Sequence, residues 1–139
     1  MHILAYKLVD DARIPTKNNP TDAGFDLYYA GAPEVIQPGD AFLAPTGCCI
    51  VIPEGFFGLV RPRSGFSVNN GTDTLAGVID AGYTGEISVV LTVEKPLHLQ
   101  NGDRMAQLLI LPVPDAVMLE VDALPETVRG GNGFGSSGK

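Results

Sequence analysis

Short runs of β-branched and aromatic residues alternate along this chain with clusters of Gly, Pro, Asn and Asp. Runs of this length, bounded by turn-forming residues, are typical of strands. No segment keeps the hydrophobic period of a helix for long, and the best helical stretch is the short segment 64–68. The pattern therefore predicts an all-β sandwich or barrel. The expected strands cover residues 3–9, 25–29, 48–52, 56–60, 86–93 and 104–113.

Length and charge limit the classes of function. A chain of 139 residues is one ordinary domain. Nine Lys and Arg residues against sixteen Asp and Glu residues give a net charge of −7. General nucleic-acid binding and docking on anionic membranes both need clustered cations. No apolar run approaches the roughly 18 residues of a membrane span. We therefore expect neither nucleic acid nor a membrane among the partners.

The two cysteines, Cys48 and Cys49, are adjacent in an apolar stretch. Neighbouring residues of a strand point to opposite faces, so we expect no disulfide between them. The first fifteen residues carry four charged side chains and no long apolar stretch, unlike a secretory signal. These features predict a reduced, cytoplasmic protein.

The last residues, 129–139, differ from the rest because they contain five glycines and two serines. Ordering such a segment costs much backbone entropy, so it is expected to form an arm outside the core. We accordingly divide the chain into a β-barrel domain, residues 1–128, and a C-terminal arm of the same domain, residues 129–139.

Two polar clusters lie in the first half of the chain. Asp22 and Asp26 flank Gly24. In a strand that starts beside them, Asp26 faces a cavity or an interface, whereas an Asx-type turn also explains Asp22. Arg63 and Ser64 lie at the predicted junction of strand and helix, where free backbone N–H groups, a hydroxyl and a guanidinium suit a phosphate. A surface loop with solvated arginines is the alternative.

Two further clusters follow. Residues 77–85 predict a hairpin whose turn holds Asp80 and Tyr83, with glycines that let a ligand approach the backbone. An Asp in a turn is also ordinary turn chemistry. Gln107 interrupts an inward-facing apolar run, and a buried amide needs partners from the backbone or from a ligand. The neighbouring Asp-Arg pair at 103–104 is expected to be structural.

Together with the arm, these clusters resemble, in order, the five motifs of the trimeric dUTPase family (deoxyuridine 5′-triphosphate nucleotidohydrolases). The second to fifth motifs read Arg-Ser-Gly, Gly-Val-Ile-Asp-Ala-Gly-Tyr, Gly-Asp-Arg-Met-Ala-Gln and Arg-Gly-Gly-Asn-Gly-Phe-Gly-Ser-Ser-Gly. The resemblance runs from Asp22 to Gly138. It implies a distorted jelly-roll-type β-barrel and a homotrimer with three active sites shared between subunits. It also implies hydrolysis of dUTP to dUMP and pyrophosphate, with Mg²⁺ as cofactor.

The resemblance assigns roles to individual residues. Asp80 is the catalytic residue and would hold the water that attacks the α-phosphorus. Tyr83 would lie under the deoxyribose and exclude UTP. Asp26 would act on the magnesium ion through water molecules. The substrate-binding residues would be Arg63, Ser64, Gly65, Thr74, Gly77, Tyr83, Gln107, Arg129, Phe134, Gly135, Ser136 and Ser137.

The binding roles divide by the part of the nucleotide. Arg63, Ser64 and Gln107 would bind the phosphate chain. Backbone groups around residues 75–77 and after Gly85 would contact the edge of the uracil and reject dCTP and dTTP.

The arm has its own roles in this scheme. Arg129 and the hydroxyls at 136–137 would close on the γ-phosphate, and Phe134 would stack on the uracil. Such contacts would recover the entropy lost when the arm orders.

Four positions depart from the usual pattern of the family, namely Thr74, Phe66, Ser67 and Asn132. A dCTP deaminase shares the fold and the hairpin motif. Its general base is a glutamate five residues after the glycine that closes the hairpin, and counting from Gly85 gives Val90. The deaminases also lack the arm. A regulatory β-trimer that only binds nucleotide is the other alternative, and it would have little reason to keep the whole catalytic set.

Overall fold

The computed structural model describes residues 2–133 of the chain. These residues form ten strands and one short helix, which confirms the all-β prediction. No helix within them has the length and apolar character that a membrane span needs. The elements are β1 (Leu4–Lys7), β2 (Gly24–Tyr28), β3 (Glu34–Ile36), β4 (Phe42–Val51), β5 (Phe56–Arg61), α1 (Ser64–Asn70), β6 (Thr72–Leu75), β7 (Val78–Ile79), β8 (Glu86–Val93), β9 (Leu97–Leu99) and β10 (Arg104–Pro112).

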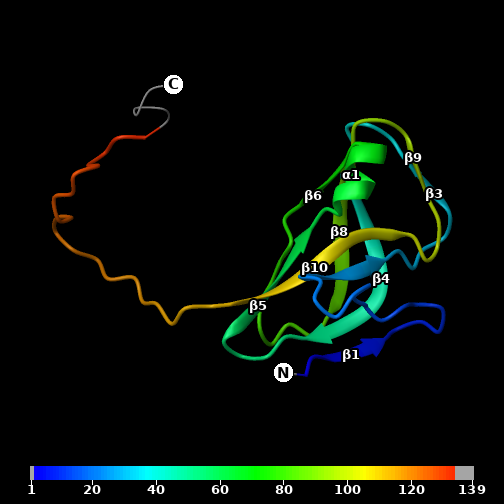
Figure 1. The fold of residues 1–139 in the computed structure, drawn as a ribbon, viewed down its shortest axis with the longest axis horizontal. Helices are drawn as coiled ribbons and strands as arrows, with labels where there is room; N and C mark the ends of the chain where they lie inside the picture. The colour runs from blue at the N-terminus through cyan, green and yellow to red at the C-terminus, as the bar shows by residue number, and fades with distance from the viewer. Residues whose placement is uncertain (1, 134–139) are drawn as a thin grey trace.

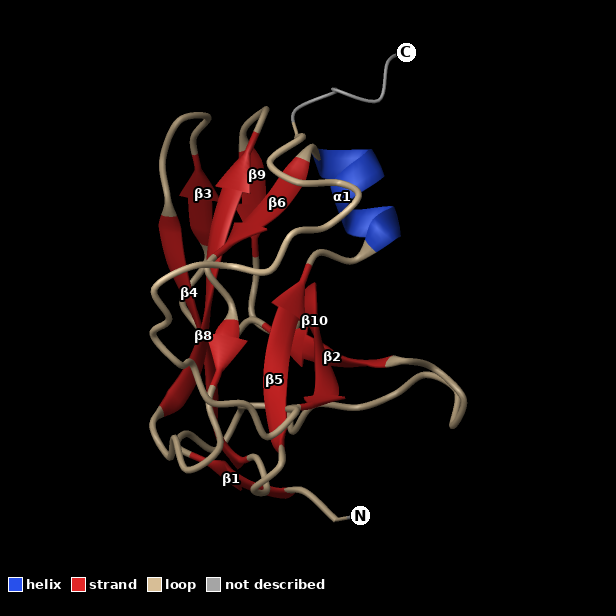
Figure 2. Ribbon diagram, turned by 90° about the vertical axis from the view of Figure 1, so that its left-hand side faces the viewer, coloured by secondary structure: helices blue, strands red, loops and turns tan. Residues whose placement is uncertain are grey.

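Two four-stranded antiparallel sheets form the body of the molecule (Figures 1 and 2). One has the strand order β1-β4-β8-β6, the other has the order β2-β10-β5-β7, and β3 pairs with β9. Buried and half-buried residues alternate along β8, so Ile87, Val89 and Leu91 point inward. They join Leu27 of β2 and Leu108 of β10 in one apolar cluster. Burying each such side chain contributes about 1.5–3 kcal/mol relative to leaving it exposed.

The six predicted strands are present, with shifted ends, and β4 begins at Phe42 rather than at residue 48. The predicted helix continues to Asn70 and ends at Gly71, whose φ of 63° is left-handed. The strands that the sequence pattern missed are β3, β6, β7 and β9. They have two to four residues each, which is too short for an alternation to show.

Strand β10 contains an irregularity that places two polar side chains. Arg104 is opposite Tyr28 of β2, but Ala106 is opposite Leu27, so one extra residue lies between them as a β-bulge. In a regular strand, residues three apart face opposite sides of the sheet. The bulge reverses this rule, and Arg104 and Gln107 therefore face the same side.

The connection between β6 and β8 differs from the hairpin expected at residues 77–85. β6 pairs with β8, but β7 crosses to the other sheet and pairs with β5. The crossing starts at Ala76 and Gly77, whose φ angles are 56° and 105°. A Cβ on Gly77 would lie 2.9 Å from the carbonyl oxygen of Val60, so the backbones approach as only glycine allows. We call residues 76–85 the Asp80 loop.

The two cysteines lie on opposite sides of β4, as predicted. Cys48 is fully buried, Cys49 is half-buried, and both thiols are free. Burial raises the pKa of the Cys48 thiol, which favours its neutral, unreactive form.

After β10 the chain leaves the body of the molecule (Figure 1). Residues 113–133, which we call the C-terminal segment, contain no strand or helix and are exposed up to residue 132. The N–H of Val113 donates to the carbonyl of Gly55 at 2.9 Å and ties the start of the segment to β5. The segment includes residues 113–128, which the sequence pattern assigned to the barrel domain.

Candidate active site

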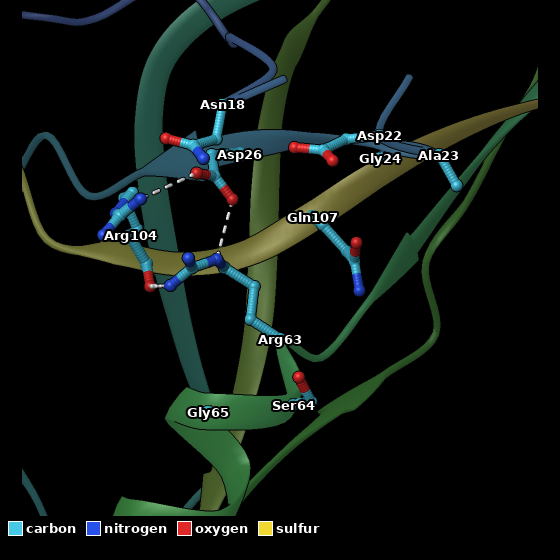
Figure 3. Close-up of a pocket in the computed structure, with 10 residues that line it drawn as sticks. All are labelled: Asn18, Asp22, Ala23, Gly24, Asp26, Arg63, Ser64, Gly65, Arg104 and Gln107. Carbon is cyan, nitrogen blue, oxygen red and sulfur yellow. Dashed lines mark hydrogen bonds and ion pairs between the residues drawn. The ribbon is translucent and has the colours of Figure 1, made fainter. Parts of the chain in front are cut away.

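A polar pocket of about 520 Å³ opens where β2 and β10 meet the start of α1 (Figure 3). Five of the residues expected to bind substrate or metal line it. They are Asp26 on β2, Gln107 on β10, and Arg63, Ser64 and Gly65 at the junction of β5 and α1. The other lining residues are Asn18, Asp22, Ala23, Gly24 and Arg104.

Asp26 lies between two arginines, as Figure 3 shows. Its Oδ1 is 2.7 Å from Nε of Arg63, and its Oδ2 is 3.3 Å from Nη1 of Arg104. Nη1 of Arg63 also donates to the carbonyl oxygen of Arg104 at 3.3 Å. The Asp26 side chain is 14% exposed, against 26% for Arg63 and 47% for Arg104. This network holds one carboxylate and two guanidinium groups on one wall of the pocket.

The amide of Gln107 is held from two sides. Its Nε2 donates to the carbonyl oxygen of Pro62 at 2.9 Å. On the other side, a Cβ on Gly24 would lie 3.1 Å from Cδ of Gln107. Only glycine at position 24 therefore leaves room for the amide. A backbone carbonyl therefore satisfies one donor of the amide.

The junction before α1 is open to the pocket. Arg63 is the N-cap residue of the helix, with extended backbone angles, and no side chain caps the helix. The first N–H groups of a helix have no partner inside it, which leaves those of Ser64 and Gly65 available. A Cβ on Gly65 would meet nothing within 4 Å. Arg63 is paired with Asp26 rather than solvated, and the junction opens into the pocket.

Asp80 and Tyr83 do not line this pocket. They belong to the Asp80 loop and border a separate pocket of about 330 Å³. Ile79, next to Asp80, is opposite Gly58 of β5, whereas Arg63 follows the far end of that strand. At about 3.3 Å per residue, roughly 15–20 Å of extended chain separates Asp80 from Arg63.

Tyr83 is held in place although its side chain is 45% exposed. Its hydroxyl donates to the carbonyl oxygen of Glu86 at 3.0 Å. Its ring covers Gly85 so closely that a Cβ there would lie 2.6 Å from Cζ of the ring. The backbone N–H of Tyr83 bonds the carbonyl of Asp80 at 3.3 Å, so the loop closes as a tight turn with both functional side chains exposed.

Thr74 and Gly77, the other two residues predicted to lie near the uracil, pack against the body of the molecule. Thr74 on β6 is 9% exposed, and its Oγ1 has no hydrogen-bond partner among the described residues. Its backbone N–H donates to Oδ1 of Asp73 at 2.7 Å. The carbonyl of Gly77 accepts the N–H of Val60 at 2.8 Å. A base contact at these positions therefore depends on the remaining backbone groups.

Arg129 lies in the C-terminal segment and does not line the polar pocket. Its Nε donates to the carbonyl oxygen of Asn132 at 3.0 Å within a turn. The other arm residues expected to contact the substrate, Phe134, Gly135, Ser136 and Ser137, lie outside the described residues.

Sequence reasoning missed the place of Arg104 in the pocket. It assigned the pair at 103–104 to structure, and Asp103 does accept the N–H of Gln100 at 2.8 Å in a turn. Arg104 instead pairs with Asp26. A regular alternation would have put Arg104 and Gln107 on opposite faces, and nothing in the sequence shows the bulge between them.

The pocket has few groups that could hold a metal ion directly. Within residues 2–133, no three His, Cys, Asp or Glu side chains lie close enough to hold one together. Asp22 accepts the N–H of Asn19 at 2.8 Å and so closes the turn at residues 19–22, a turn contact that differs from the expected Asx-type one. Any metal here would need oxygen ligands from a bound molecule or from water.

The sequence matches the dUTPase family model over residues 10–138. It is 44% identical to a deoxyuridine 5′-triphosphate nucleotidohydrolase of Kluyveromyces lactis, with 93% of this chain and 88% of the relative covered. A Tropheryma whipplei protein of the same name is 48% identical, with 85% and 84% covered. The dUTPase of Staphylococcus bacteriophage 80alpha, solved with dUpNHpp, superposes with a TM-score of 0.90 at 28% identity over 99% of both chains.

The fold and these comparisons thus define an all-β hydrolase of jelly-roll type with a polar pocket between β2, β10 and the start of α1. The chain belongs to the dUTPase family. It is a dUTP diphosphatase.

Proposed function

We propose that this enzyme converts dUTP to dUMP and pyrophosphate by attack of a water molecule on the α-phosphorus, with Asp80 holding the water and Mg²⁺ as cofactor. The observation that supports this most is the pocket at Arg63, Ser64 and Gln107. A guanidinium, a hydroxyl and free N–H groups face one cavity, and these are the donors that phosphate oxygens accept. Asp80 is exposed and can act as the general base, a role that contributes roughly 10²- to 10⁴-fold.

The charges of the pocket support a divalent cation. Asp22 and Asp26 balance Arg63 and Arg104, so the charged residues that line the pocket have no formal net charge. A neutral pocket does not offset the charge of a triphosphate. Mg²⁺ is usually held by substrate phosphates and water with one or two carboxylates, and a half-buried pair of carboxylates fits that donor set. Asp26 would hold water ligands of the ion, which supplies charge compensation along the phosphate chain.

We further propose that Asp80 reaches the phosphates from a second copy of the chain, within a homotrimer that shares its active sites. Asp80 and Arg63 lie at opposite ends of β5, so one rigid chain cannot bring them onto one nucleotide. A neighbouring copy can present its Asp80 loop to the polar pocket without unfolding either strand.

An apolar sheet face beside the Asp80 loop is suited to that contact. Leu43, Val90 and Leu75 are opposite one another on β4, β8 and β6, so they share the outer face. Leu43 is 63% exposed and Val78, at the base of the loop, is also 63% exposed. Leu43 and Val78 border the same pocket as Asp80. Covering this face with a second copy would remove apolar surface from water and place Asp80 at the interface.

The fixed ring of Tyr83 supports discrimination against UTP. The ring is held by Gly85 and by the carbonyl of Glu86, so it cannot easily retreat from an added 2′-hydroxyl. Backbone groups of the Asp80 loop would contact the uracil edge and reject dCTP and dTTP. The arm would close the site, with Arg129 on the γ-phosphate, Phe134 on the uracil, and Gly135, Ser136 and Ser137 around the phosphates.

The general base that a dCTP deaminase needs is absent from this chain. The position of its glutamate base is Val90, an apolar residue between Leu43 and Leu75. The two free thiols support a reducing compartment, and we propose the cytoplasm.

Assays with dUTP, dCTP, dTTP and UTP in the presence of Mg²⁺ test this function, with pyrophosphate and ammonia measured separately. We expect pyrophosphate from dUTP alone, and loss of turnover after chelation with EDTA that added Mg²⁺ restores. Ammonia from dCTP would favour the deaminase. Comparable turnover of UTP would contradict the role of Tyr83, and binding of dUTP without hydrolysis would favour the regulatory alternative.

A further inference from the structure

We propose that Arg104 is a positioning residue, which shares the negative charge of Asp26 with Arg63 so that the Nη2 donor of Arg63 stays available to phosphate. The inference rests on the proposed function and adds a residue that the sequence pattern assigned to structure. It depends on three charged groups in contact on one wall of the pocket (Figure 3).

The contacts divide the Asp26 carboxylate between its partners. Nε of Arg63 contacts Oδ1 of Asp26 at 2.7 Å, and Nη1 of Arg104 contacts Oδ2 of Asp26 at 3.3 Å. The other bond of Arg63 runs from Nη1 to the Arg104 carbonyl. Within residues 2–133, Nη2 of Arg63 has no hydrogen-bond partner and remains available at the pocket wall.

Removing the Arg104 side chain would change this balance in a defined way. The Asp26 carboxylate is only 14% exposed, so water offers it limited compensation. It would then draw more strongly on Arg63, its remaining cationic partner among residues 2–133, and the pocket would gain a net negative charge. Both effects oppose the binding of a polyphosphate, and both act through Asp26.

The bulge in β10 is the structural basis of the arrangement. It turns Arg104 to the same side as Gln107, whereas a regular strand would direct Arg104 away from Asp26. The guanidinium reaches the carboxylate from β10 while Arg63 reaches it from the junction before α1. Two elements thus converge on one carboxylate of β2.

A double-mutant cycle tests the proposal. We would measure the Kd of dUpNHpp with Mg²⁺ for wild type, Arg104→Met, Asp26→Asn and the double variant. In the wild-type background we expect Arg104→Met to weaken binding about fivefold, the size expected for one partly exposed ion pair. In the Asp26→Asn background the same change should weaken binding less than about twofold, because its partner is gone.

Kinetics and controls separate this role from a structural one. Arg104→Met should raise KM for dUTP by a similar factor while kcat stays near the wild-type value, because Asp80 lies outside this network. Arg104→Lys, which keeps the charge, should recover most of the loss and replaces the Met variant if that one melts early. Arg61→Met is the matched control, since Arg61 is an exposed arginine of β5 that does not line the pocket.

Equal losses of affinity in both Asp26 backgrounds would overturn the proposal, because Arg104 would then bind the nucleotide independently of Asp26. A fall in kcat with unchanged KM would overturn it too, as would an equal loss in Arg61→Met. Wild type that neither binds dUpNHpp nor hydrolyses dUTP would instead contradict the proposed function.

Discussion

The polar pocket and the Asp80 loop, to which we assign phosphate binding and water activation, are built in opposite ways. The pocket is assembled within one chain by β2, β10 and the start of α1, and its charged groups already bond one another. The Asp80 loop is held firmly at its base by β5, yet it presents Asp80 and Tyr83 to solvent. The C-terminal segment with Arg129 is exposed from residue 113 to residue 132.

Under the proposed function, the polar pocket would supply most of the binding energy for the phosphate chain, and the Asp80 loop would supply the catalytic carboxylate. If the pocket binds the phosphate chain as proposed, its donors are preorganised by contacts within one chain, which lowers the cost of binding. In the proposed mechanism, Asp80 would reach these donors only when a second copy of the chain assembles beside the pocket. Binding and turnover should therefore respond separately to substitutions in the two regions.

The largest expected effect is that of Asp80→Asn. The amide cannot accept a proton from the attacking water, so we expect kcat to fall about 10³-fold while dUpNHpp still binds. Asp40→Asn, an exposed carboxylate in a turn, is the control. A kcat near that of wild type would remove Asp80 from the mechanism.

The next effect is that of a chain ending at residue 128. Without Arg129 and the residues beyond it, we expect kcat/KM to fall about a hundredfold, because a cation on the phosphate chain is lost. The strands end at Pro112, so circular dichroism and the melting temperature should stay close to those of the full chain. Full activity of the shortened chain would show that the arm has no role.

A smaller effect is expected from Tyr83→Ala. Loss of the ring should narrow the preference for dUTP over UTP by about tenfold, measured as the ratio of kcat/KM values. Tyr83→Phe keeps the ring and loses only the bond to Glu86, so it should keep most of the preference. An unchanged ratio in the Ala variant would mean that the sugar is recognised elsewhere.

The sequence predicted the parts of the site that depend on local pattern. Arg63 and Ser64 are at the expected junction, because Pro62 and Gly65 mark the end of a strand and the start of a helix. Gln107 is at the pocket, because one polar residue in an apolar strand points to a partner.

The features that the sequence did not predict depend on how distant strands pair with one another. The bulge after Arg104 and the crossing of β7 to β5 are set by pairing between distant segments. The positive φ of Ala76 could not be predicted either, because alanine rarely adopts the left-handed conformation. The separation of Asp80 from Arg63 likewise follows from their places at opposite ends of β5, which no local motif encodes.

The shared-site claim is tested most directly by mixing two inactive variants, Asp80→Asn and Arg63→Met, and letting their subunits exchange. If each site combines the loop of one chain with the pocket of another, random assembly at equal amounts should restore about one quarter of the wild-type activity. Wild type mixed with the Asp80→Asn/Arg63→Met double variant should also give about one quarter, rather than the one half of a site within one chain. Mixed single variants that stay inactive after proven exchange would contradict the account.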